Sequence, residues 1–393
     1  MSRLSRLSLI SFVESMAAIL VGRGLFFYTH DRLGFTDGEN LGLAVSGSVV
    51  YVFAAVASHR VSQRLSEKRL LAAMVTGQIL SYGALIASPG SAIIVAANAG
   101  LGLFNGMKWP LLESYFAAGQ TPEATARAIG RFSLSWVMAG PLALAAAGPL
   151  IDWNVRSLFA AAVLFNAISL LLMRPLERRP VHLAEDHPER PTEAGLARCR
   201  ALLASSRCSM LTNCSLMAVL AALMPRLFAD LGMTVAGATA LAALMEGVRG
   251  ATFFALHRHT GWHNRRGPLA AVVAGLPAGF LLILLGPNLA VVLAGEAIFG
   301  VAAGITYYAS LYYSMVVENA RVEGGGAHEG LIGAGWAVGP LAGIVGRLVP
   351  GLGPAGGVVA GIGPVIAACS AGAVWFLAKA RPRTADGAVD AQG

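Results

Sequence analysis

The chain has 393 residues, of which 56% are hydrophobic and 13% charged, and its formal net charge is +8 at pH 7. Soluble domains carry about a quarter charged residues, so a chain of this composition could not cover a water-exposed surface and must be solvated mostly by lipid. The basic residues lie between apolar segments and do not form a patch interleaved with aromatics, which excludes nucleic acid as a partner and indicates membrane topology.

Apolar runs long enough to cross about 30 Å of hydrocarbon follow one another along the chain. Six precede residue 175, at 8–28, 41–58, 70–88, 91–117, 128–150 and 155–174. Six more follow residue 207, at 208–229, 233–256, 268–286, 289–313, 329–349 and 357–378. These runs predict an all-α membrane protein with twelve transmembrane helices.

The second half of the chain repeats the first at an offset of 198 residues. The basic loop HRVSQRLSEKRLLAAMVTG, from His59 to Gly77, corresponds to HRHTGWHNRRGPLAAVVAG, from His257 to Gly275. The pair Gly102 and Gly106 likewise recurs as glycines at 300 and 304. A period of half the chain indicates a tandem duplication, so we expect two pseudo-symmetric six-helix bundles.

A polar, charged stretch at 175–207 separates the two copies, so we expect bundles at 1–174 and 208–380 joined by a linker that carries a short surface helix at 192–206. Residues 381–393 are expected to be a disordered tail. Basic residues concentrate in the loops on one side of the predicted helices. By the positive-inside rule the linker and both termini face the cytoplasm of a cell (inner) membrane.

The cysteines and histidines show no metal-ligand spacing. Cys199, Cys208, Cys214 and Cys369 are interpreted as free thiols. We therefore expect neither a metal site nor a cofactor.

Two six-helix halves with a charged central linker, and a basic loop between the second and third helices of each half, resemble the major facilitator superfamily. In that family the loop usually reads G-x-x-x-D-R-x-G-R-R. Arg64 and Lys68 match this pattern, whereas Gln63 stands where the acid is expected and Ser66 where the second glycine is expected. The resemblance covers nearly the whole chain, and it implies that helices one, four, seven and ten line a central cavity.

A further family pattern, G-x-x-x-G-P-x-x-G, occurs in the eleventh run as Gly335, Gly339, Pro340 and Gly343. In fifth helices the family associates this pattern with antiport. Small residues four apart also allow two helix backbones to approach closely, so helix packing is the alternative interpretation.

A charge inside a membrane-spanning helix costs roughly 2.5 to 3.5 kcal/mol on insertion scales, so we single out eight charged residues of the predicted helices as functional candidates. They are Glu14, Arg23, Lys108, Glu113, Arg226, Glu246, Arg249 and Glu296. We expect Glu14, Glu113 and Glu296 to carry protons or contact substrate. Arg23 and Lys108 would bind an anionic group, with helix bridging as the alternative for all five. Arg226 near the outer end either snorkels to headgroups or serves a gate.

Helical geometry predicts which of these charges can share a face. Glu14 and Arg23 are nine residues apart and so about 180° apart around the helix, which allows only one of them to face a cavity. Glu246 and Arg249 are three apart, so they can form an intrahelical ion pair with a structural or gating role.

Polar and aromatic residues of the same helices are candidates to line the cavity. They are Asn98, Asn105, Asn213, Tyr307 and Tyr308. Tyrosines at helical spacing can hydrogen-bond a ligand, and an aromatic belt at the membrane interface is the alternative interpretation.

These features predict a monomeric secondary active transporter that moves a small solute by alternating access, coupled to protons. A lipid or amphiphile translocator on the same fold and a non-transporting membrane sensor are the alternatives. The sequence lacks G-x-x-x-x-G-K-[ST], H-E-x-x-H and G-x-S-x-G motifs, so we expect neither ATP-driven transport nor an enzyme.

Overall fold

The computed structural model describes residues 2–118, 122–180, 193–318 and 322–380, and these residues contain helices and no β-strand. The first half forms α1 (Arg3–Leu33), α2 (Asp37–Leu65), α3 (Glu67–Ala87), α4 (Ser91–Ala117), α5 (Pro122–Val137) and α6 (Ala139–Met173). The second half forms α7 (Glu193–Asp230), α8 (Val235–Arg258), α9 (Gly267–Leu285), α10 (Leu289–Glu318), α11 (Val322–Gly346) and α12 (Pro354–Lys379). The tail predicted at 381–393 lies outside the described residues.

Ten helical segments of the described residues are long and apolar enough to cross a membrane. α4 is not among them, because Asn98, Asn105, Lys108 and Glu113 interrupt its apolar run. The segment Gly130–Met173 counts once, although 44 residues in one straight helix would measure about 66 Å, roughly twice the hydrocarbon thickness.

The boundaries of α5 and α6 differ from the predicted runs at 128–150 and 155–174. α5 ends at Val137 because Pro141 has no N–H to continue the hydrogen bonds of the helix. α6 then continues past residue 150 to Met173, with extended, non-helical backbone at Asn154 inside it. The boundary that the sequence predicts between the fifth and sixth runs, at 151–154, thus coincides with this kink inside α6.

α7 also begins earlier than the sequence predicts. Residues 193–207, predicted to belong to the linker, continue directly into the membrane-length helix. Leu202 and Leu203 are buried in one cluster with Trp262 and Tyr313. Packing of this helical extension against the loop after α8 therefore explains why it is not a separate surface helix.

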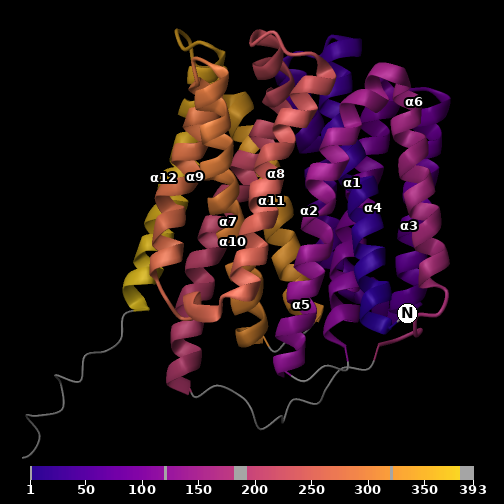
Figure 1. Cartoon of the computed structure of the whole chain (residues 1–393), viewed down its shortest axis with the longest axis vertical. Helices are drawn as coiled ribbons and strands as arrows, with labels where there is room; N and C mark the ends of the chain where they lie inside the picture. The colour runs from indigo at the N-terminus through magenta and orange to yellow at the C-terminus, as the bar shows by residue number, and fades with distance from the viewer. Residues whose placement is uncertain (1, 119–121, 181–192, 319–321, 381–393) are drawn as a thin grey trace, which may run out of the picture.

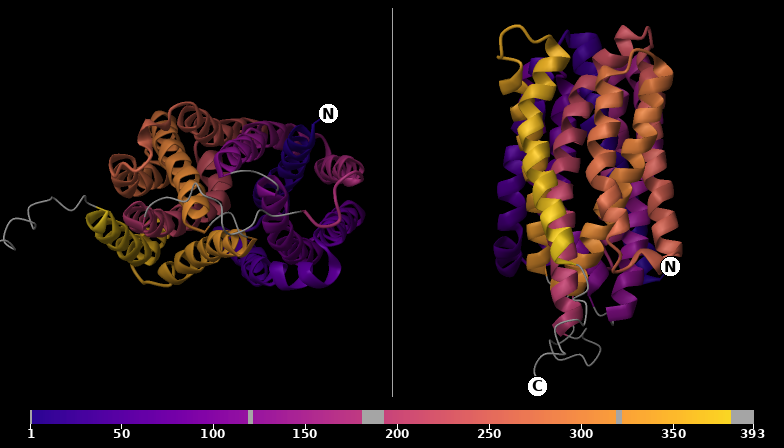
Figure 2. Two further views of the ribbon diagram at one scale, coloured as in Figure 1. Left: turned by 90° about the horizontal axis from the view of Figure 1, so that it is seen from below. Right: turned by 90° about the vertical axis from the view of Figure 1, so that its left-hand side faces the viewer.

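The first-half helices gather on one side of the molecule and the second-half helices on the other (Figure 1, Figure 2). The two halves meet where α2 packs on α7 and α11, α4 on α11, and α6 on α8. α1 begins and α12 ends at the same end of the molecule (Figure 1, Figure 2). We call it the basic end, because α2, α8 and α12 end there with Arg64, Arg258 and Lys379 in their last turns, and we call the opposite end the far end.

The same close helix contact occurs once in each half. A Cβ added to Gly102 of α4 would collide with the carbonyl oxygen of Gly47 in α2. At the repeat offset of 198 residues, a Cβ added to Gly300 of α10 would collide with the carbonyl oxygen of Met245 in α8. The duplicated sequence thus builds a duplicated helix crossing, in which only glycine lets the backbones approach.

Replacing one of these glycines is expected to weaken folding. Gly102→Val forces α2 and α4 apart, and overpacking of this kind costs about 1–3 kcal/mol or more. We expect a lower midpoint of thermal unfolding for the detergent-purified protein than for Gly83→Val, because a side chain at Gly83 meets open space. Equal midpoints for the two variants would contradict the close contact.

The glycines of the eleventh helix have the same role. Gly335 and Gly339 of α11 lie against Cys214 and Ser215 of α7, and added side chains would collide with them. Close packing of α11 on α7 accounts for this part of the G-x-x-x-G-P-x-x-G pattern.

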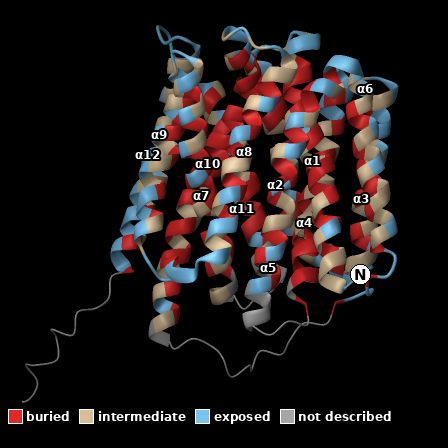
Figure 3. Cartoon of the chain, viewed as in Figure 1, coloured by how far each residue is buried: buried red, intermediate tan, exposed pale blue. Residues whose placement is uncertain are grey.

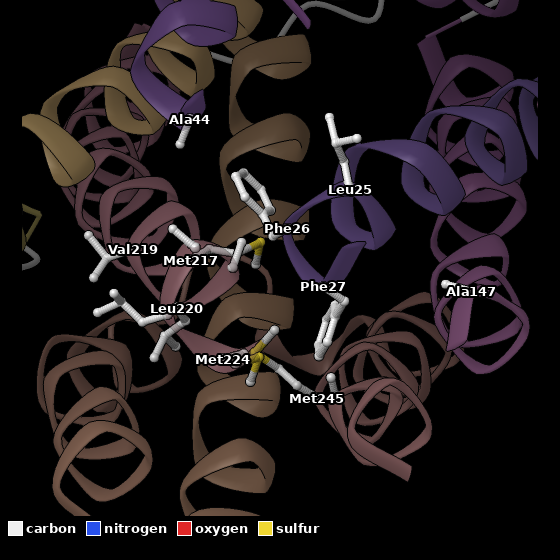
Figure 4. Close-up of a cluster of buried hydrophobic side chains, with 14 of the residues drawn as sticks. Leu25, Phe26, Phe27, Ala44, Ala147, Met217, Val219, Leu220, Met224 and Met245 are labelled. Carbon is white, nitrogen blue, oxygen red and sulfur yellow. The ribbon is translucent and has the colours of Figure 1, made fainter. Parts of the chain in front are cut away.

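Buried residues lie along the inner faces of the helices, and the outer faces are more exposed (Figure 3). The largest group of buried hydrophobic side chains draws on both halves, with Leu25 and Phe27 of α1, Ala147 of α6, Leu220 of α7 and Met245 of α8 (Figure 4). This shared core holds the halves together around a central cavity.

Candidate functional site

A cavity of about 300 Å³ lies between the two halves. Side chains from α1, α2, α3, α4, α5, α7, α8, α10 and α11 line it. Most of them are apolar or aromatic, and four are carboxylate or guanidinium side chains: Arg23, Glu246, Arg249 and Glu329. A ligand here would contact both halves at once.

Arg23 and Arg249 share one carboxylate in the wall of this cavity. Arg23 Nη1 of α1 lies 3.5 Å from Glu246 Oε1 of α8, and Arg249 forms an ion pair with the other oxygen of Glu246. The Arg249 guanidinium also lies over the ring of Trp136, 4.9 Å from its centroid. The first of these contacts joins the two halves.

Four of the five polar and aromatic residues predicted to line the cavity do so: Asn98, Asn105, Asn213 and Tyr307. Asn98 Nδ2 donates to the carbonyl oxygen of Leu43 at 2.8 Å, and the Asn213 Oδ1 atom is buried without a hydrogen-bond partner among the described residues. Asn105 lies within hydrogen-bonding distance of Gln78, at 2.8 Å.

Tyr307 packs on Trp136 with ring centroids 4.7 Å apart. Tyr308 differs from the prediction because it is not among the lining residues. Its hydroxyl lies 3.2 Å from His257 Nδ1, and its ring packs edge-on against Trp262. One residue further along a helix is about 100° further around, so the two tyrosines face different sides of α10.

Glu14 and Lys108 form an ion pair inside the first half. Lys108 Nζ of α4 donates to Glu14 Oε2 of α1 at 2.8 Å, and both side chains are 0% exposed. Gln78 of α3 lies between this pair and Asn105. Neither charge lines the cavity, so on α1 it is Arg23 that faces the cavity and Glu14 that contacts a neighbouring helix.

Glu113 of α4 is hydrogen-bonded to a carboxyl group that the sequence did not single out, Glu329 of α11. The Tyr51 hydroxyl of α2 donates to the same Glu329 side chain. Both glutamates are buried, and together with Tyr51 they join the halves toward the basic end. Glu329 stands at the first residue of the predicted eleventh run, where a charge is ordinarily assigned to the interface.

Glu296 of α10 is fully buried but does not line the cavity. Within the described residues it forms no ion pair and no hydrogen bond with another side chain, and the backbone of Met245 is the polar group that acts on its carboxyl group. Arg23 and Glu246 are the charged neighbours that act on it electrostatically.

Arg226 joins the halves at the far end. Its Nη1 atom lies 2.9 Å from Asp37 Oδ2, and Arg347 Nη1 lies 2.8 Å from the same oxygen. Asp37 is the first residue of α2, and its side chain is only 7% exposed. Arg226 belongs to α7, and Arg347 directly follows α11. The sequence did not single out Asp37, because it precedes the second apolar run.

A family model described as Major Facilitator Superfamily matches residues 7–344. The chain belongs to the Major Facilitator Superfamily. The resemblance of the loop and helix patterns is therefore confirmed, and this chain is a multi-pass membrane transport protein.

Solved structures of the superfamily share its fold. The human organic anion transporter MFSD10 (TETRAN) is 16% identical with a TM-score of 0.68, and the match covers 96% of this chain and 98% of that one. The nucleoside transporter NupG is 13% identical with a TM-score of 0.67, covering 98% and 100%. FucP in its outward conformation is 13% identical with a TM-score of 0.64, covering 96% and 98%. A comparison with curated proteins finds no match.

Proposed function

We propose that this protein is a secondary active transporter that moves a small solute by alternating access and couples the movement to protons. The observation that carries the proposal is a cavity between the halves with a polar contact between the halves on either side of it. Breaking one contact while keeping the other would open the cavity to one side of the membrane at a time.

The contact toward the basic end involves a proton. A hydrogen bond between the carboxyl groups of Glu113 and Glu329 needs a proton on one of them. Loss of that proton leaves two negative charges facing each other across the halves, and their repulsion favours opening. The other ionisable groups around the pair are Tyr51 of α2, Tyr307 of α10 and Cys214 of α7.

The contact at the far end has fixed charges of opposite sign. Asp37 is held by Arg226 and Arg347 together, so opening on this side separates one carboxylate from two guanidinium groups. We propose this cluster as the far-end gate, which assigns Arg226 a gating role.

For the topology we propose twelve crossings, with the kink in α6 separating the fifth from the sixth and α4 as a polar crossing. The bundles 1–174 and 208–380 move against each other. The positive-inside rule supports a cytoplasmic location for the basic end and both termini, and we propose that the protein is a monomer in the inner membrane of the cell.

The fold does not identify the solute, since one of the similar solved structures is named an organic anion transporter and another a nucleoside transporter. An amphiphile translocator is the second candidate, favoured by the mostly apolar and aromatic lining of the cavity. Transport of a water-soluble solute by the purified protein in liposomes distinguishes the two.

Asp37→Asn tests alternating access, with chemical labelling of the native Cys214 as the readout. Cys214 lines the cavity and is 3% exposed. In a background with the other three cysteines replaced by serine, a membrane-impermeant maleimide is applied from the far-end side. We expect the substitution to raise the labelling rate of Cys214 about tenfold, since hydrogen bonds to charged groups stabilise by about 1.5–3 kcal/mol.

Asp31→Asn serves as the matched control, because Asp31 forms a partly exposed ion pair with Arg32 close to the far end of α1. An unchanged labelling rate for Asp37→Asn, or the same increase for Asp31→Asn, would contradict the far-end gate.

A further inference from the structure

Two hydrogen-bond donors in the cavity wall have no partner among the described residues. They are Arg249 Nε and Trp136 Nε1, both buried. The Arg249 guanidinium lies over the Trp136 indole, 4.9 Å from its centroid, so the two donors belong to side chains in direct contact. Buried N–H groups are normally satisfied, and a pair left open in a cavity wall marks the place of an acceptor.

Charge in this part of the cavity does not balance. Glu246 is one carboxylate between two guanidinium groups, those of Arg23 and Arg249, which leaves one positive charge in excess. The other acid that lines the cavity, Glu329, is hydrogen-bonded to Tyr51 and Glu113 toward the basic end. Among the described residues it forms no ion pair with either arginine.

Glu296 does not remove this excess. It has no ion-pair partner among the described residues, and burying an unpaired carboxylate costs far more than burying the neutral acid. We therefore assign Glu296 the neutral form.

Arg23 is able to take part in ligand binding. Within the described part of the chain, its hydrogen-bond contact with Glu246 is long, at 3.5 Å, and its second hydrogen-bond contact is to the sulfur of Met224 at 4.0 Å. A thioether is a weak acceptor, so a bound anion would compete with it readily. Arg23 and Arg249 approach from different halves, and an anion between them would draw the halves together.

The rest of the cavity is suited to a flat ring. Aromatic side chains line it from several helices, among them Phe26 of α1, Trp136 of α5, Tyr307 of α10 and Trp336 of α11. Aromatic walls favour flat partners, which they contact by stacking or edge to face. A volume of about 300 Å³ is at the lower end of the range for ligand pockets, which suits a single ring system.

We infer that the cavity binds a small organic monoanion with one flat apolar ring, whose anionic group accepts hydrogen bonds from Arg249 and Trp136 and pairs with Arg23. This inference rests on the proposed transport function and names the class of its solute.

Benzoate, benzamide, benzylammonium and cyclohexanecarboxylate separate the contributions of charge and shape. Binding of each probe to the detergent-purified full chain is measured by titration calorimetry. We expect benzoate to bind at least tenfold more tightly than the neutral amide or the cation. Cyclohexanecarboxylate keeps the charge but not the flat ring, and we expect it to bind several-fold more weakly than benzoate.

Three substitutions in the wall test the assigned contacts. Arg249→Gln should weaken benzoate binding at least tenfold. Trp136→Phe keeps a ring and removes the N–H donor, and should weaken it several-fold. Arg258→Gln is the matched control, since Arg258 is exposed at the basic end of the same helix and should leave the affinity unchanged.

Glu246→Gln is expected to produce a gain in affinity for one ligand, which a misfolded variant would not show. Removal of this carboxylate raises the excess from one positive charge to two, so phthalate, a dianion, should gain affinity relative to benzoate. The inference is overturned if benzoate binds no better than benzamide, or if phthalate gains nothing in Glu246→Gln.

Flux measurements keep the two proposals separable. Benzoate that binds with the expected selectivity but is not moved across liposomes would overturn transport of this class and leave the binding site standing. Proton-driven uptake of a cationic or neutral solute that benzoate does not inhibit would overturn the binding site and leave the transporter standing.

Discussion

Proton-driven uptake should fall at least tenfold in Glu329→Gln and in Glu113→Gln. A glutamine at either position can still hydrogen-bond the remaining carboxyl group, but it has no proton to release at cytoplasmic pH. The contact between α4 and α11 then no longer opens by charge repulsion. We therefore expect loss of coupling rather than loss of folding.

Proteoliposomes with an imposed pH gradient measure this effect, and solute exchange without a gradient provides the second readout. Exchange should persist in both variants, because it does not require net proton movement. Asp152→Asn is the control, since the one ion pair of Asp152 among the described residues is a long, exposed contact with Arg32 at 3.7 Å. Gradient-driven uptake equal to that of the unmodified protein would refute the proton-carrying role of the pair.

Lys108→Met should destabilise the folded protein severely. It removes the only cation that the described structure places within ion-pair distance of Glu14, and both side chains are 0% exposed. Breaking a buried ion pair from one side costs about 3–5 kcal/mol, because a buried charge loses its partner. We expect a large fall in the unfolding midpoint and in the yield of folded protein.

The double substitution Glu14→Gln and Lys108→Met tests this reason, since it removes both charges. It should recover much of the lost stability, because replacing a whole buried pair is often close to neutral. Lys379→Met, at an exposed lysine over Trp375, should change the midpoint little. A double variant as unstable as the single one would show that charge balance is not what the pair contributes.

The membrane class and the superfamily could be predicted from sequence because both depend on local or repeated patterns. Apolar runs of helical length indicate crossings whatever their neighbours are. Spacing along one helix likewise predicts shared faces: Glu246 and Arg249, three apart, lie on one side of α8, and Arg23 faces the cavity while Glu14 does not.

The sequence was less informative about where helices end. Leu202 and Leu203 belong to a polar stretch that reads as a linker, yet their burial against Trp262 makes them part of α7. The run of α4 reads as a crossing in sequence, although α4 is not among the ten segments of the described residues that are long and apolar enough to cross a membrane.

By itself the sequence determined the apolar runs, the duplication and the inventory of charges within the runs, since each of these follows from residue order alone. Only the tertiary structure decided the partners: Glu113 with Glu329, Asp37 with two arginines, and Lys108 with Glu14. Such partners come from different helices, often from different halves of the chain. Which of them meet depends on how the helices are rotated and crossed, and that is set by packing at contacts such as Gly102 on Gly47.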